Sequence, residues 1–550
     1  MLGMDPPQMA YEPTSTSVST IDDSGKPTKP TKAEDWSEDK YPSYLESSAD
    51  SVTSSTALDR QQWRYKLIAL ISVLLMSAGE HFVSNSLSSL KSTLKKELDI
   101  TNTHYGILSG TVSLINTVVP FFVGVIMDTF GPGWGALVAC SAIVVGNFLT
   151  VMGTYAQSFA LLVIGRVVFA LGSSSIVLAQ ETILTGWFRG KGLALSIGLQ
   201  IMTSKLFGWL ASATVVDIAE GTGFYGNAFW VGEGIALFSL VMVAMYGLVM
   251  FRLRRSQGSV VTGHRSGALA LAFSGQSARE GDRSKRPRAT WRQLYTMVYF
   301  PDIYWYLPLN EMVMGAVWTP FLGIAAEYVM KRWHEKTSVA AWKSSISLAV
   351  PIVGSPVIGL FIDRFGARGP TTIASAVLLL VAVVLLGWTH VSPEAGLTLF
   401  SLSLTIGPVA LISAVALYLP LNMVGTGIGL LKCGLNFGII IVDVLVGRLQ
   451  DFDNDSYDRV MVMMLILACA AVVTSTLFMI SDHYWERGIQ DAPYARRNVL
   501  VEERRPKEQA VIQAAADRAR PPTYRYMYFG IFLALFIVSW VLYGVFLMVA

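Results

Sequence analysis

The chain has 550 residues, of which 52% are hydrophobic and only 15% charged, and its formal net charge is +3. So apolar a composition excludes an ordinary soluble protein, whose core must be covered by polar surface. The small net charge excludes a chain dominated by one sign, so any signal for a partner must lie in the distribution of charge among the loops.

Residues 1–62 are rich in Ser, Thr, Pro and Asp and hold no long apolar run, which predicts a disordered cytosolic tail. Twelve apolar runs follow, each close to the 20 or so residues that a helix needs to cross the hydrocarbon core. They lie at about 65–90, 105–127, 134–154, 158–182, 192–216, 226–251, 303–329, 340–362, 370–389, 395–419, 424–448 and 459–480. A thirteenth run, at about 526–550, ends the chain.

The distribution of basic residues predicts how these spans are oriented. The segment between Arg252 and Arg292 holds ten Lys or Arg against two acids, Glu280 and Asp282. Short loops rich in Lys and Arg remain in the cytosol, so this segment is expected there. The N-terminus is expected on the same side, because an even number of spans, six, separates it from this segment.

The sequence therefore predicts an all-α membrane protein with two six-helix bundles and a thirteenth, C-terminal transmembrane helix. The predicted parts are the tail at 1–62, the first bundle at 63–252, a basic cytosolic loop at 253–300, the second bundle at 301–481, a charged cytosolic linker at 482–523 and the extra helix at 524–550.

One phrase occurs twice, at the end of the second span of each predicted bundle. It reads GVIMDTFGPGW at 124–134 and GLFIDRFGARG at 359–369, and its aspartates, Asp128 and Asp363, are 235 residues apart. Two copies in equivalent places indicate a parallel internal repeat. We expect each aspartate to accept hydrogen bonds from a helix N-terminus or an Arg of the facing bundle, in a contact that breaks when the bundles rock.

The remaining residues of the phrase have expected roles in the same contact. Small residues let helices approach closely, glycine suits a tight turn, and arginine could supply a cation to the aspartate. The glycines for close approach are Gly124 and Gly359, those for the turn are Gly131 and Gly366, and the cations are Arg364 and Arg368.

The phrase resembles the loop signature of the major facilitator superfamily, close to G-x-x-x-D-R-x-G-R. The second copy fits it well, whereas the first has Thr129 and Pro132 where the superfamily prefers basic residues. Arg166, in IGRVVFALG, resembles the intramembrane arginine motif of that superfamily, which implies a gating or structural role. The resemblance implies a transporter fold that exposes a central site to each side in turn.

Longer stretches resemble the lysosomal dipeptide transporter branch of that superfamily. They are GRVVFALGSSSIVLAQETILTGWFRGKGLALSIGLQIMTSK (165–205), VWTPFLGIAAEYV (317–329), SPVIGLFIDRFG (355–366) and VGTGIGLLKCGLNFG (424–438). This resemblance implies uniport of dipeptides out of an acidic compartment, across a lysosomal or vacuolar membrane. It also implies a glycosylated accessory membrane protein as a partner. The sequence shows no sorting signal, which leaves the plasma membrane open.

The branch implies an acid in helix four and an arginine in helix five that contact the peptide termini. The matching positions here are Ser174 and Lys205, and Glu181, two turns beyond Ser174, is a candidate to supply the missing carboxylate. The Gln and Asn that the branch carries in helix eleven correspond to Lys432 and Asn436.

Nine ionisable groups lie within predicted spans, where charge is costly and usually faces a polar path. They are Glu80, His81, Arg166, Glu181, Lys205, Glu233, Glu311, Lys432 and Asp443. Lys205 and Lys432 are the best candidates to bind a carboxylate, with simple pairing to Glu181 or Glu311 as the alternative. Three acids, Glu181, Glu233 and Asp443, are near predicted helix ends and could equally reach toward the membrane surface.

Glu80 and His81 are candidate proton carriers, together with Glu311, because burial brings an acid toward the working pH range. The alternative for His81 is a packed side chain without a transport role.

Three classes of function remain open. The preferred one is a transporter of small polar solutes, dipeptides foremost; the second is a proton-coupled carrier of monocarboxylates or organic anions; the third is a receptor or scaffold that transports nothing. The chain carries no P-loop, zinc-binding His pair or nucleophile motif, so an enzyme, a cofactor and a metal are not expected. Membrane orientation or anionic lipid explains the basic loop better than nucleic acid does.

Overall fold

The computed structural model describes residues 61–90, 102–189, 192–257, 297–419, 423–452, 457–494 and 525–549, with short pieces within 93–99 and 496–506. All of them belong to one compact unit of the chain, Ser51–Ala550. The predictions for the tail as far as residue 60, for the loop at 258–296 and for most of the linker before the last helix lie outside the described residues.

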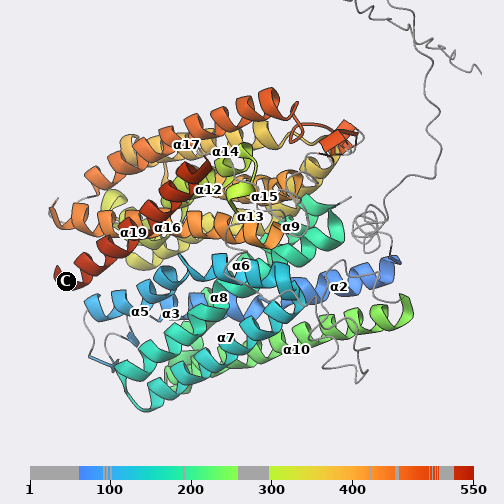
Figure 1. Ribbon diagram of the computed structural model, residues 1–550. Helices are drawn as coiled ribbons and strands as arrows, with labels where there is room; N and C mark the ends of the chain where they lie inside the picture. Colours follow the sequence, from blue (N-terminus) through green and yellow to red (C-terminus); the bar gives the residue numbers. More distant parts are fainter. Residues whose placement is uncertain are drawn as a thin grey trace, which may run out of the picture. The chain divides into compact units, whose positions relative to one another are not determined.

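The described residues form helices throughout, without strands (Figure 1). The first half contains α2 (Trp63–Leu75), α3 (Ala78–Ser89), α5 (Asn102–Ile115), α6 (Val119–Phe130), α7 (Pro132–Tyr155), α8 (Phe159–Phe188), α9 (Leu193–Thr222) and α10 (Gly226–Gln257). The second half contains η5 (Asp302–Trp305), α12 (Tyr306–Trp333), α13 (Thr337–Phe365), α14 (Arg368–Trp388), α15 (Pro393–Tyr418), α16 (Val424–Phe452) and α17 (Asp458–Trp485), and α19 (Arg525–Val549) follows.

The helices account for the predicted spans. In the part of the chain that the structure describes, 12 helices are long and apolar enough to cross a membrane, or 13 if a bent pair in the second span counts as one. The multi-pass membrane architecture and the helix beyond the two bundles are therefore confirmed.

The first span is broken between α2 and α3, at Met76 and Ser77. A break inside a membrane frees backbone groups that must find partners within the protein. The Gln180 amide nitrogen donates to the carbonyls of Val73 and Leu74, at 2.6 and 3.1 Å. The first turn of α3, which holds Glu80, follows directly after the break and is buried.

The second span was expected to be one helix, but it bends by 45° between Gly110–Asn116 and Val119–Asp128. The physical reason is Pro120, which lacks an amide hydrogen and whose ring conflicts with the carbonyl four residues earlier, that of Asn116. The Thr117 hydroxyl donates to Leu114 O at 2.6 Å, and the same carbonyl accepts from the Thr117 amide at 3.2 Å.

The two bundles meet along two helix pairs that occupy equivalent places in the repeat. In one pair α6 of the first bundle packs against α16 of the second, and in the other α13 of the second bundle packs against α9 of the first. These junctions hold both copies of the repeated phrase.

Candidate functional site

Asp128 lies at the end of α6 and caps the N-terminus of α16 in the other bundle. Its Oδ1 accepts from the Gly425 amide at 2.9 Å, and its Oδ2 accepts from the amide and hydroxyl of Thr426, both at 2.6 Å. The first amides of a helix have no partner in the helix itself and carry partial positive charge, so a carboxylate is well suited to them. We call this contact the Asp128 cap.

Asp363, at the end of α13, makes the equivalent contact in the opposite direction. Its two carboxylate oxygens accept from the Ala194 and Leu195 amides at the N-terminus of α9, at 3.1 and 2.8 Å. We call this contact the Asp363 cap, and the end of the molecule that carries both is the cap end.

Glycines one turn before each aspartate allow the helices to come this close. A Cβ on Gly124 would lie 2.4 Å from the carbonyl oxygen of Gly425, and a Cβ on Gly359 would lie 2.4 Å from that of Ala194. Real Cβ atoms do not approach carbonyl oxygens so closely, so any larger residue would push the bundles apart.

Gly131 and Gly366 end α6 and α13 with positive φ angles of 97° and 78°. L residues with a side chain rarely adopt this region, which explains why glycine ends both copies of the phrase.

The two arginines of the phrase are not direct partners of Asp363, contrary to our expectation. Arg364 is exposed, with its guanidinium 5.5 Å from the Phe365 ring, and Arg368 is buried, with Nε donating to Ser413 Oγ at 3.0 Å. The reason is geometric, because both carboxylate oxygens of Asp363 already accept from backbone amides. Among the described residues, Arg368 acts on Asp363 only at longer range.

An ion pair between α8 and α16 joins the two bundles. The Lys432 ammonium on α16 lies 2.8 Å from the carboxylate of Glu181 on α8, whose side chain is 1% exposed against 15% for Lys432. Pairing, the alternative interpretation of Lys432, is thus the geometry observed. Glu181 does not reach toward the membrane surface from a helix end, since α8 continues to Phe188 and the Glu181 side chain is buried.

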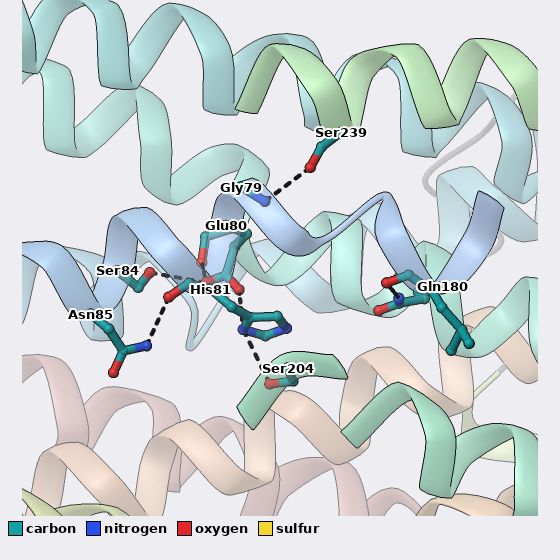
Figure 2. Close-up of polar contacts among 10 residues, drawn as sticks. Gly79, Glu80, His81, Ser84, Asn85, Gln180, Ser204 and Ser239 are labelled. Atoms are coloured by element: carbon teal, nitrogen blue, oxygen red, sulfur yellow. Dashed lines mark hydrogen bonds and ion pairs between the residues drawn. The ribbon is translucent and has the colours of Figure 1, made fainter. Parts of the chain in front are cut away.

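A second group surrounds Glu80 at the start of α3 (Figure 2). Glu80 Oε2 lies 2.6 Å from His81 Nδ1, and Oε1 accepts from the hydroxyls of Ser84 and Ser173, at 3.0 and 2.8 Å. Ser204 Oγ on α9 lies 3.2 Å from the same ring nitrogen, and His81 Nε2 is buried without a hydrogen-bond partner among the described residues. The imidazole therefore bridges α3 and α9.

Two further charges complete this set. Lys205 lies within electrostatic range of Glu80 and Lys432, and Glu311, which is 3% exposed, lies within range of Lys432 and Glu181. We call these six residues the central charge cluster: Glu80, His81, Glu181, Lys205, Glu311 and Lys432. Three carboxylates thus face two ammonium groups and one imidazole.

Two expected substrate-binding residues flank the cluster. Ser174 is half-buried on α8, whereas its neighbour Ser173, which the sequence did not single out, makes the hydrogen bond to Glu80. Asn436 is buried on α16 one turn beyond Lys432, and its amide donates to the Lys432 carbonyl at 2.8 Å.

Three ionisable groups lie apart from the cluster in the described contacts. Arg166 is buried on α8 with its guanidinium 4.8 Å from the Phe169 ring, and Glu233 accepts from Asn147 at 2.9 Å within the first bundle. Asp443 is exposed on α16, about three turns beyond Lys432 and on the same helix face.

Sequence reasoning expected a helix N-terminus of the facing bundle as one possible partner of each aspartate, but it did not identify which amides donate. These amides lie at the starts of α9 and α16. The only sequence signal for them is the repeat itself, because Asp128 and Asp363 are 235 residues apart and Ala194 and Gly425 are separated by a similar distance, 231 residues. Sequence reasoning also missed Ser204, because a single serine inside an apolar helix carries no sequence signal of a functional role.

Two bundles related by an internal repeat, with reciprocal caps and a buried charge cluster between them, are the architecture of a secondary transporter. The family model of the Major Facilitator Superfamily matches residues 70–324 and 309–550, so the chain belongs to this family.

Among curated relatives, the chain is 24% identical over 405 residues to a lysosomal dipeptide transporter, MFSD1 of Bos taurus, covering 72% of this chain and 81% of that protein. It is 29% identical over 147 residues to monocarboxylate transporter 14 of Mus musculus, over 25% of this chain and 27% of that protein. Among solved structures, the proton:xylose symporter XylE aligns with a TM-score of 0.57 at 14% identity, covering 78% of this chain and 96% of that one. This likeness supports the fold.

Proposed function

We propose that the chain is a dipeptide uniporter of the lysosomal or vacuolar membrane. The observation that carries the proposal is the Lys432–Glu181 ion pair, which joins the two bundles where the central charge cluster lies. The resemblance to lysosomal dipeptide transporters over 72% of the chain supports the substrate class and the compartment.

A zwitterion fits this ion pair without leaving a charge unpaired. We assign the peptide carboxylate to Lys432 and the peptide ammonium to Glu181, with Glu311 nearby as a second acceptor. An extended dipeptide is about 7 Å long, so its two charges can separate the pair while each buried ion keeps a partner. Lys205, Ser174 and Asn436 would line the same site.

Substrate release would use the caps. We propose that the Asp128 and Asp363 caps close the cytosolic side and break when the bundles rock, with Gly124, Gly359, Gly131 and Gly366 shaping the contact. Arg166, Arg364 and Arg368 are assigned to support this movement. A glycosylated accessory membrane protein is proposed as a partner on the likeness to the dipeptide transporters alone.

A second candidate is a proton-coupled carrier of monocarboxylates or other organic anions, which the partial likeness to monocarboxylate transporter 14 favours. An anion on Lys432 would displace Glu181 from its cation, and that buried carboxylate would then need a proton. In this alternative Glu80 and His81 would carry protons, and the plasma membrane would suit the transporter equally.

Counterflow into proteoliposomes separates these candidates. Labelled dialanine and labelled lactate are offered to the purified protein at pH 5 and pH 7, with Lys432→Gln as the test variant. The control is Lys331→Gln, at a half-buried residue outside the cluster whose ammonium lies 2.7 Å from the Glu327 carboxylate. Dialanine counterflow that Lys432→Gln abolishes supports the proposal, while lactate counterflow driven by low pH supports the alternative. Counterflow of neither solute, with biological activity intact in Lys205→Ala, would favour a receptor or scaffold.

A further inference from the structure

The helix beyond the twelve, α19, contacts both bundles at one of the two junctions. Phe532 lies between Phe121 of α6 and Phe437 of α16, with ring centroids 6.4 and 5.0 Å away. In Figure 1 the red α19 runs beside α16. One aromatic side chain therefore touches the two helices that the Asp128 cap joins.

A second contact lies at the break in the second span. The Trp540 indole nitrogen donates to Thr117 Oγ1 at 3.0 Å, and the Tyr543 hydroxyl lies so close to Gly110 that a Cβ there would be 2.8 Å from it. Thr117 sits in the break itself, where backbone groups are freed within the membrane. The second half of α19 is thus fitted to the first bundle.

The beginning of α19 is attached to the second bundle instead. Tyr528 stacks on Trp305 with centroids 5.5 Å apart, and Arg525 donates to the Tyr299 carbonyl at 3.5 Å and lies 3.7 Å from Asp302. These contacts are at the start of the seventh span. The helix therefore crosses the α6–α16 junction, with its beginning attached to the second bundle and its second half attached to the first.

The rest of the α19 surface is suited to lipid. Large apolar side chains along it are exposed, among them Met527, Ile531, Leu533, Ile537, Val538, Val541 and Val545. The equivalent junction between α9 and α13 is contacted by α15 of the second bundle, but by no helix from outside the two bundles among the described residues. The repeat is thus symmetric in its caps and asymmetric in this helix.

We propose that α19 is an intramolecular clasp that favours the conformation in which the Asp128 and Asp363 caps are made. The inference rests on the proposed alternating access. Breaking the Asp128 cap moves α6 away from α16, and Phe532 then loses Phe121 or Phe437. Trp540 and Arg525, anchored on different bundles, cannot both keep their partners. Opening the cap end therefore costs the contacts of α19 as well as those of the caps.

The test measures the two bundles directly. Spin labels are placed at Phe130 and Phe365, exposed residues at the cap ends of α6 and α13, in a full-length background in which Cys140, Cys433 and Cys469 are replaced by serine. Distances between the labels are recorded by pulsed electron resonance in lipid nanodiscs. The parent is expected to populate mainly the short distance.

Two conservative variants interrupt the clasp from either side, Trp540→Phe and Thr117→Val. Both remove the hydrogen bond between Trp540 and Thr117, and Thr117→Val also removes the bond from Thr117 Oγ1 to Leu114 O. Each should raise the long-distance population at least twofold, and the double variant should add nothing beyond Thr117→Val. Val541→Ala, 56% exposed on the lipid face of α19, should match the parent. Parent-like distances in both single variants would overturn the clasp.

This measurement needs no substrate, so it fails independently of the proposed function. A shift of distances without counterflow of either solute removes dipeptide transport and keeps the clasp. Counterflow with unchanged distances in the variants removes the clasp and keeps the transporter.

Discussion

The Lys432 ammonium and the Glu181 carboxylate lie 2.8 Å apart on helices of opposite bundles, α16 and α8. Any movement that separates the bundles at this depth must break the pair or replace one of its partners. Because Glu181 is almost fully buried, leaving it charged and alone is costly.

Removing one partner of this pair should destabilise the protein more than removing both. Lys432→Gln leaves the Glu181 charge buried, and we expect a loss of about 3 kcal/mol in the free energy of unfolding. Lys432→Leu with Glu181→Leu should recover most of it. Thermal denaturation of the purified variants measures the difference.

The matched control is the pair of Lys331 and Glu327 on α12, whose side chains are 35% and 48% exposed. Lys331→Gln should cost about 0–1 kcal/mol. Equal losses at the two pairs would show that burial of Glu181 does not decide the stability of the cluster.

Loss of either cap should loosen both junctions, if the bundles move as rigid bodies. Asp363→Ala removes the acceptors for the Ala194 and Leu195 amides, at a cost typical of a helix cap, about 1–2 kcal/mol. Hydrogen exchange by mass spectrometry should then rise at the start of α9 and also at the start of α16.

Asp128→Ala provides the reciprocal experiment, with faster exchange at Gly425 and Thr426 and, in turn, at the start of α9. Exchange that rises only at the helix whose cap was removed would mean that the two junctions open separately.

Added volume at the repeated glycines should weaken the closed cap end. Gly124→Ala and Gly359→Ala each place a Cβ 2.4 Å from a backbone carbonyl oxygen of the other bundle, and overpacking of this kind costs about 1–3 kcal/mol. Pulsed electron resonance between the bundles should report a larger separation at the cap end.

Gly234→Ala is the control, because no atom lies within 4 Å of a Cβ at that helical position. It should leave the distance unchanged and slightly favour the helix. A similar separation in all three alanine variants would point to a general effect of alanine.

Asp491 gives a pH dependence outside the membrane spans. Burial raises the pKa of its carboxyl above the ordinary value, against the opposing effects of the Gly369 amide, which donates at 2.8 Å, and of His483 and Arg368. A carboxyl whose pKa is higher in the folded state stabilises that state below its unfolded pKa, and this contribution is lost as the pH rises through the folded pKa. Asp491→Asn keeps an acceptor for Gly369 and should raise the melting temperature at pH 7 more than at pH 4.

The measurement is a series of melting curves from pH 4 to pH 8 for the parent and the variant. A gain that grows toward low pH has the wrong sign for a raised pKa and would contradict this account.

Much of the fold follows from the sequence, because a bilayer allows few solutions. Apolar runs of about 20 residues must be helices in lipid, and basic loops orient them. The thirteen runs and the twice-written phrase were therefore enough to predict two bundles and an extra helix. The turn positions of Gly131 and Gly366 could be predicted for a similar reason, since a tight turn after a helix restricts the choice of residue.

The partners of each charge were decided by the tertiary structure alone. The residues that meet Asp128 and Glu181 lie 297 and 251 positions further along the chain, and no local pattern specifies which of several buried cations or helix starts a carboxylate will reach. The bend at Asn116 and the crossing of α19 over it depend likewise on how separate helices pack. The sequence by itself determined which segments enter the membrane, because hydrophobicity is a property of each segment; only the packed helices decided which charges face one another, because pairing depends on distances in space.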